Sequence, residues 1–178
     1  MEALIVIDYT LDFVTGKLPV GEPALAIEER IAELTEEHLR RGDLVVMAVD
    51  LHEENDPDHP ETKLFPPHNI RGTEGRELFG KLREVYDRNR DRILWMDKTR
   101  YSAFFRTALQ EELSKRNIDT IRLVGVCTDI CVLHTAVDAY NLGYRTIVHP
   151  SAVASFNPAG HDWALQHFRA SLGAEVRD

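Results

Sequence analysis

The sequence has few cysteines, no excess of positive charge and no long hydrophobic run. Only two of its 178 residues are cysteine, Cys127 and Cys131, so a disulfide framework is excluded as the source of stability. Two cysteines without an export signal at the N-terminus are typical of reduced thiols, and we expect a cytoplasmic protein. A chain of this size can bury a sufficient core by itself, and we expect one domain over residues 1–178.

Basic residues are outnumbered by acidic ones. The chain has 21 Lys and Arg against 30 Asp and Glu, a formal net charge of −9. Phosphate groups are bound by clustered Lys and Arg, so this balance argues against nucleic acid or an anionic membrane as a partner. No segment approaches the roughly 20 apolar residues that a membrane-spanning helix needs. We therefore expect a soluble protein with a small-molecule substrate, while association into a homo-oligomer stays open.

Short apolar segments alternate with longer amphipathic ones. The predicted strands are residues 3–10, 43–52, 90–98, 118–126 and 144–150, with 173–176 as a candidate edge strand. The predicted helices are residues 22–42, 75–87, 102–117, 129–142 and 158–172. Apolar strands separated by helices are typical of a parallel sheet that is covered on both faces. The fold prediction is α/β: a doubly wound, mainly parallel sheet of five to six strands with helices on both faces.

Residues 51–75 interrupt this alternation with a segment rich in proline, histidine and acids. Long loops are uncommon in compact domains and are often functional. A surface insertion without a function is the alternative interpretation.

Polar side chains follow the predicted strands at the edge where open α/β sheets bind their ligands. These residues are Asp8, Asp50, His52, Asp97, Lys98, Cys127 and Cys131. Each type alone has an ordinary explanation, as a turn aspartate, a solvated lysine or a buried cysteine. Their combination at one edge favours acyl transfer by a thiol.

A free thiol has a pKa of about 8.5 and needs a base or a cation to become a good nucleophile. Asp8 can receive the thiol proton, and Lys98 can hold Asp8 and stabilise the thiolate. Cys131 is expected in the first turn of a helix, where the helix dipole favours a thiolate. We therefore predict Cys131 as the nucleophile, with the backbone N–H groups of Cys127 and Cys131 as an oxyanion hole.

The start of this helix has candidate capping residues. The preceding strand is expected to end near Val126, and Thr128 or Asp129 can cap the helix that follows.

A metal site is predicted beside these residues. Asp50 and His52 are two positions apart and project to the same side of an extended segment, and His68 arrives later in the loop. Nitrogen and oxygen ligands with open positions suit a catalytic Zn²⁺, Mn²⁺ or Fe²⁺. Glu61 is a candidate fourth ligand and His59 a weaker one. Exposed loop histidines without a metal are the alternative.

Four segments together resemble a known family. They are IDYTLDFV (7–14), the loop from Asp50 to Gly75, MDKTRYSAF (96–104) and GVCTDICVLHTAVDAYNLGY (125–144). In this order and at these strand ends they resemble the isochorismatase-like cysteine hydrolases, and among these the nicotinamidases (pyrazinamidases). The similarity runs along nearly the whole chain.

The resemblance implies hydrolysis of nicotinamide to nicotinate and ammonia through a cysteine thioester, a step of pyridine nucleotide salvage. It implies a cis peptide bond before Cys127 and one divalent metal ion, with Zn²⁺ first and Mn²⁺ or Fe²⁺ as alternatives. The implied catalytic residues are Asp8, Lys98 and Cys131. The implied metal ligands are Asp50, His52, Glu61 and His68. The implied ring-contacting residues are Phe13, Phe65 and Tyr101, for which core packing is the alternative.

Three positions depart from the common pattern of the family, and all leave the implied triad intact. Leu51 and Ile130 stand where many members have aromatic residues, and Cys127 stands where alanine is frequent. Another small amide or a carbamoyl compound is therefore an alternative substrate. A redox role for Cys127 and Cys131 is disfavoured because the usual dithiol motif is Cys-x-x-Cys. An inactive binding module is disfavoured because every triad position holds a competent residue.

Overall fold

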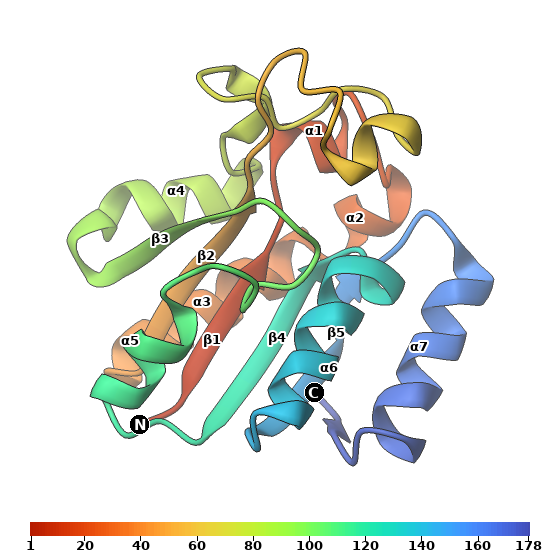
Figure 1. Cartoon of the computed structure of the whole chain (residues 1–178). Helices are drawn as coiled ribbons and strands as arrows, with labels where there is room; N and C mark the ends of the chain where they lie inside the picture. The colour runs from red at the N-terminus through yellow and green to blue at the C-terminus, as the bar shows by residue number, and fades with distance from the viewer.

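A computed structural model describes all 178 residues, and its strands form one six-stranded sheet (Figure 1). The strands are β1 (Ala3–Ile7), β2 (Leu44–Asp50), β3 (Ile93–Lys98), β4 (Thr120–Val126), β5 (Arg145–Ala154) and β6 (Glu175–Val176). Their order is β3-β2-β1-β4-β5-β6, and every neighbouring pair is parallel. The predicted doubly wound sheet is confirmed, with six strands and no antiparallel pair.

Helices cover both faces of the sheet, as predicted. They are α1 (Leu11–Val14), α2 (Glu22–Ala26), α3 (Glu28–Arg41), α4 (Gly80–Arg88), α5 (Leu109–Lys115), α6 (Leu133–Asn141) and α7 (Pro158–Ala170). Alternate residues of β1 enter two separate cores. Leu4 and Val6 pack with residues of α3 and α4, whereas Ile5 and Ile7 pack with residues of α5, α6 and α7. None of the helices is both long and apolar enough to cross a membrane.

Several helix boundaries differ from the prediction. The helix expected over 22–42 is two helices that meet at Ile27, and the second ends at Gly42, whose φ of 75° is the left-handed conformation that terminates helices. The expected helix 75–87 begins only at Gly80, after a short 3-10 turn (Glu74–Arg76). Of the expected helix 102–117 only α5 is helical. The start of that segment, residues 102–108, makes turns instead, in which the side chains of Ser102 and Thr107 hydrogen-bond to the local backbone.

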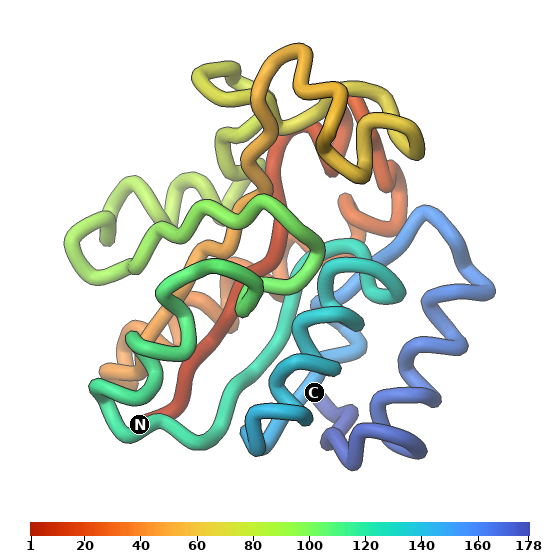
Figure 2. The backbone as a smooth tube through the Cα atoms, viewed as in Figure 1, coloured from red at the N-terminus to blue at the C-terminus, as the bar shows by residue number.

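The order of strands reverses between β1 and β4, where a crevice is expected at the carboxyl ends. Close pairing at this position requires glycine: Gly125 has a φ of 112°, and a Cβ there would lie 2.0 Å from the carbonyl oxygen of Ile7. Residues 51–75 pass over this end of the sheet, at the top of the view in Figure 2, while both termini lie at the opposite end. The loop contains a 3-10 turn (Pro60–Lys63) and a bridge between His52 and Ile70, and a second 3-10 turn (Glu74–Arg76) begins at its end.

Candidate active site

Four neighbouring strands bring four polar side chains to one point. Asp8 follows β1, Asp50 ends β2, Lys98 ends β3, and Cys131 follows β4 by five positions. All four side chains are buried. Asp8 has a φ of 53°, a left-handed conformation that aspartate tolerates better than most residues. Its Oδ1 accepts a hydrogen bond of 2.7 Å from the backbone N–H of Asp50.

The ammonium group of Lys98 lies between two carboxylates and the thiol. Its Nζ is 2.7 Å from Asp8 Oδ2, 2.6 Å from Asp50 Oδ1 and 3.5 Å from Cys131 Sγ. Burial alone would lower the pKa of Lys98, but the adjacent charges of Asp50 and Asp8 outweigh it and hold this pKa well above its ordinary value. The lysine is therefore a fixed positive charge at the centre of the cluster.

The Asp8 carboxyl and the Cys131 thiol are both biased toward their neutral forms. Burial, with repulsion from Asp50, raises the pKa of Asp8 to about 6. Burial also raises the pKa of the Cys131 thiol well above its ordinary value, although Lys98 opposes this shift. Burial therefore favours the protonated thiol, whereas Lys98 and the expected helix dipole favour the thiolate. Burial has this effect because Cys131 is only 4% exposed.

The turn that carries Cys131 is π-helical over Thr128–Val132 and precedes α6. The peptide bond between Val126 and Cys127 is cis, which confirms this expectation. The carbonyl oxygen of Cys127 accepts two hydrogen bonds of 3.1 Å, from the N–H groups of Ile130 and Val132, while the Cys127 N–H takes part in no backbone hydrogen bond. The oxyanion-hole role of Cys127 and Cys131 stays a prediction.

Two polar contacts tie this turn to α7 and to the segment before it, and sequence reasoning missed them. Ser155 Oγ donates a 2.6 Å hydrogen bond to Asp129 Oδ1, and Thr128 Oγ1 lies 2.8 Å from His161 Nδ1. The expected capping role of Thr128 and Asp129 is wrong, because neither side chain caps the helical turn. Both side chains reach across to another element, which no local pattern reveals.

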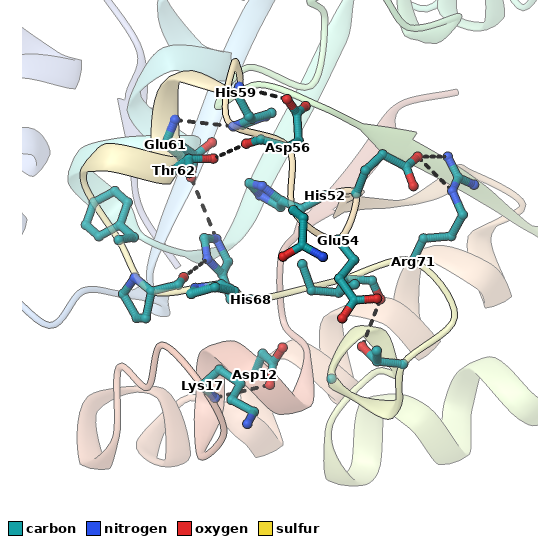
Figure 3. Close-up of a pocket in the computed structure, with 18 of the residues that line it drawn as sticks. Asp12, Lys17, His52, Glu54, Asp56, His59, Glu61, Thr62, His68 and Arg71 are labelled. Atoms are coloured by element: carbon teal, nitrogen blue, oxygen red, sulfur yellow. Dashed lines mark hydrogen bonds and ion pairs between the residues drawn. The ribbon is translucent and has the colours of Figure 1, made fainter.

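The four predicted metal ligands lie together at the inner edge of the loop, and Figure 3 shows three of them, His52, Glu61 and His68. One ligand atom from each of Asp50, His52, Glu61 and His68 lies within 4.8 Å of the other three, and all four residues are buried. Asp50 Oδ2, His52 Nε2, Glu61 Oε1 and His68 Nε2 have no hydrogen-bond partner. Buried polar atoms without a partner are costly, so this arrangement fits a cation that all four contact.

The hydrogen bonds of the imidazole nitrogens determine which histidines have a nitrogen free to bind a metal. His68 Nδ1 lies 2.8 Å from the carbonyl oxygen of Pro66, so Nδ1 carries the proton and Nε2 keeps a lone pair for a metal. His59 instead uses both nitrogens: Nε2 donates to the Thr99 carbonyl at 2.8 Å, and Nδ1 accepts from the Glu61 N–H at 3.2 Å. His59 holds the loop in place and is not a free ligand.

Electrostatics also fit a cation at this cluster. Burial and repulsion from Asp50 raise the pKa of Glu61 to about 7, which is the response of a carboxylate packed against another without a sufficient positive charge. Two imidazoles and two carboxylates are a donor set that suits Zn²⁺, Mn²⁺ or Fe²⁺.

The predicted aromatic residues border the cluster at different depths. Phe13 is buried and meets the His68 ring edge-on at a centroid distance of 5.1 Å. Phe65 is half-buried and meets both His68 and Phe156 at 6.4 Å. Tyr101 packs against His134 at 5.1 Å. Phe156, which joins the loop to the segment before α7, was not predicted because its neighbours in sequence carry no recognisable motif.

Known proteins that resemble this chain in sequence and in structure belong to one family. The family model for an isochorismatase domain matches residues 2–178. The chain belongs to the isochorismatase family. A Bacillus subtilis isochorismatase family protein, PncA, is 58% identical over 181 residues, which covers 99% of each chain.

Two solved structures of the isochorismatase family extend this comparison. The structure described as nicotinamidase/pyrazinamidase PncA from Bacillus subtilis superimposes with a TM-score of 0.97 at 55% identity and covers 100% of both chains. The Pyrococcus horikoshii pyrazinamidase in complex with zinc has a TM-score of 0.87 at 30% identity and covers 98% of this chain and 97% of its own.

Proposed function

We propose that this isochorismatase-family hydrolase converts nicotinamide and water to nicotinate and ammonia, with Cys131 as the nucleophile. The observation that carries the proposal is the buried contact of Lys98 with Asp8, Asp50 and Cys131, which joins an acid, an amine and a thiol beside a cluster of metal-binding groups. The similarity to a nicotinamidase/pyrazinamidase over the full chain supports the substrate class.

The first half of the reaction forms a thioester. Cys131 Sγ attacks the carboxamide carbon while Asp8 accepts the thiol proton. Coupling these two events avoids a free buried thiolate, which the raised pKa of the thiol disfavours. Lys98 stays charged throughout and stabilises the negative charge that passes from sulfur to the carbonyl oxygen. Asp8 then gives the proton to the departing amine, and the C–N bond breaks to release ammonia.

The second half restores the enzyme. Asp8, again ionised, accepts a proton from a water molecule that attacks the thioester carbonyl. The C–S bond breaks, nicotinate leaves, and the proton returns to Cys131. In both halves the N–H groups of Cys127 and Cys131 would donate to the tetrahedral oxyanion, a contribution of about 3–4 kcal/mol per donor in comparable sites.

The ring of the substrate needs a fixed orientation over Cys131. Asp50, His52, Glu61 and His68 would hold a divalent ion, which when bound supplies a point of attachment for the pyridine nitrogen. Phe13, Phe65 and Tyr101 would pack against the ring and exclude water from the thioester. Zinc is the ion that the similarity to a zinc-bound pyrazinamidase favours.

The test is ammonia release by the purified, zinc-loaded protein with nicotinamide, pyrazinamide and a carbamoyl amide as separate substrates. We expect turnover of the two ring amides and its loss after chelation. Turnover of the carbamoyl compound alone, unaffected by chelation, would replace nicotinamide with that substrate class.

A further inference from the structure

A cavity of about 810 Å³ lies under the loop of residues 51–75 (Figure 3). It lies on the outer side of the four candidate metal ligands Asp50, His52, Glu61 and His68, here called the metal cluster. Its walls include three of the four candidate ligands, His52, Glu61 and His68. They do not include Asp8, Lys98 or Cys131. The cavity thus reaches the cluster without exposing the nucleophile.

The walls of this cavity carry a strong excess of negative charge. Six carboxylates line it, against the cations Lys17 and Arg71. Those carboxylates belong to Asp12, Glu53, Glu54, Asp56, Glu61 and Glu74. Arg71 is already paired with Glu53 at 2.6 Å. Concave surfaces lined by one sign of charge concentrate the opposite ion and raise its rate of arrival.

The inner end of the cavity presents atoms that lack partners. His52 Nε2, Glu61 Oε1 and His68 Nε2 have no hydrogen bond, although their residues are only 7%, 5% and 2% exposed. The His68 nitrogen can only accept, because its other nitrogen donates to the Pro66 carbonyl. Acceptors at the end of an acidic cavity suit a cation and disfavour an anion.

We propose that this cavity is the route by which a divalent cation enters the cluster, separate from the path of the amide to Cys131. The inference rests on the proposed metal site. Glu54 and Glu74, exposed at the outer part and engaged in no ion pair, attract the hydrated ion. The buried acceptors then replace its water. Lys17 opposes entry, because it is a cation of the cavity wall without a carboxylate partner.

The test measures Co²⁺ uptake by the chelated protein in a stopped-flow instrument, from the visible absorbance of the bound ion. The double variant Glu54→Gln/Glu74→Gln should bind Co²⁺ about 3–10 times more slowly at low ionic strength, and the difference should shrink in high salt because exposed charges are screened. Lys17→Gln should bind faster than the wild type. Glu84→Gln, an exposed carboxylate on α4 outside the cavity, is the matched control and should not change the rate.

Steady-state turnover of nicotinamide by each fully loaded variant separates the possible results. Unchanged kcat and KM with slower uptake support the proposed route. Unchanged uptake in the double variant would overturn the proposed route. A raised KM for nicotinamide together with normal uptake would show that the cavity is instead the substrate entrance. Co²⁺ uptake that His68→Ala leaves intact would also overturn it. If Co²⁺ uptake depends on Glu54 and Glu74 as proposed but the loaded wild type releases no ammonia, only the proposed function is refuted.

Discussion

Asp50 Oδ1 lies 2.6 Å from Lys98 Nζ, the ammonium group that also contacts Cys131. Asp50 is also one of the four candidate metal ligands, so one carboxylate belongs to both groups of residues. Its second oxygen, Oδ2, is 3.7 Å from His52 Nε2. Burial alone would raise the pKa of Asp50, but Lys98 and His52 outweigh it and hold this pKa at about 2. Asp50 is therefore ionised, and it is the side chain that contacts both Lys98 and the candidate metal ligand His52.

Replacement of Lys98 tests this electrostatic arrangement. Lys98→Met leaves Asp8 and Asp50 buried without their counter-charge, and loss of one partner of a buried pair costs about 3–5 kcal/mol of unfolding free energy. Urea unfolding with and without the substitution measures this loss. Lys115→Met, in exposed pairs on α5, should change stability by less than about 1 kcal/mol. Equal stability of the two variants would contradict the arrangement.

The two cysteines should respond unequally to substitution. Cys131→Ala removes the proposed nucleophile, and ammonia release should fall about 10⁴-fold or more. Cys127→Ala keeps the backbone N–H, so it should retain a measurable rate. The comparison uses ammonia release at saturating nicotinamide, with circular dichroism to confirm folding. Equal losses in both variants would show that the sulfur of Cys127 takes part in the chemistry.

Zinc should stabilise the folded protein. An ion that binds only the folded chain adds about 2.7 kcal/mol at a free concentration 100 times its Kd, and a thermal melt with and without zinc detects this gain. His68→Ala should abolish most of the gain. His59→Ala should keep it, because both ring nitrogens of His59 are used within the loop. Loss of the zinc effect in His59→Ala alone would contradict the ligand assignment.

The contact between Asp129 and the first turn of α7 should position the turn that carries Cys131. A Cβ at Gly160 would lie 2.0 Å from Asp129 Oδ2, and such overpacking costs about 1–3 kcal/mol. Gly160→Ala should therefore lower both stability and kcat. In a double-mutant cycle with Asp129→Ala the two effects should couple by about 0.5 kcal/mol or more. Strictly additive losses would show that the two positions do not interact.

Acid should destabilise the protein through a histidine far from the active site. Burial, reinforced by Arg122, lowers the pKa of His149 from 6.5 to about 4. Below pH 6.5 the unfolded chain binds a proton that the folded chain refuses, so the free energy of unfolding falls between pH 6.5 and about 4. Urea unfolding at pH 7.5 and 5.0 should show a smaller fall for His149→Asn than for the wild type. The charged groups that act on His149 are Arg122, Arg30, His38 and Asp178.

An equal fall in the free energy of unfolding of the wild type and of His149→Asn would show that other groups cause the acid sensitivity. His38, whose pKa burial also lowers against the opposing effect of Asp43, contributes to both proteins in the same direction.

The sequence predicted the elements of the site better than the contacts between them. Asp8, Asp50 and Lys98 could be placed at one edge because each follows an apolar strand, and parallel strands end together. The sharing of Asp50 between Lys98 and the metal cluster could not be predicted, because it depends on the pairing of β2 with β3.

The same limit explains the errors around the nucleophile. The raised pKa of the Cys131 thiol depends on burial by segments distant in sequence, which no local pattern reveals. The sequence predicts Asp129 as a local cap because aspartate is a preferred residue at the start of a helix. Its actual partner, Ser155, is 26 positions away. Helix ends at Ile27 and Gly80 likewise depend on tertiary packing rather than on local propensity.

The strand order has a consequence for the newly made chain. Cys131 meets Asp8 and Lys98 only after β4 has paired with β1, a contact between segments more than 110 positions apart. Long-range pairing of parallel strands is slow because the connecting chain must first be ordered. A ribosome-bound chain that ends before β4 holds Asp8, Asp50 and Lys98 but no thiol. The proposed catalytic group can therefore assemble only after the last of its four strands, β4, has been made and has joined the sheet.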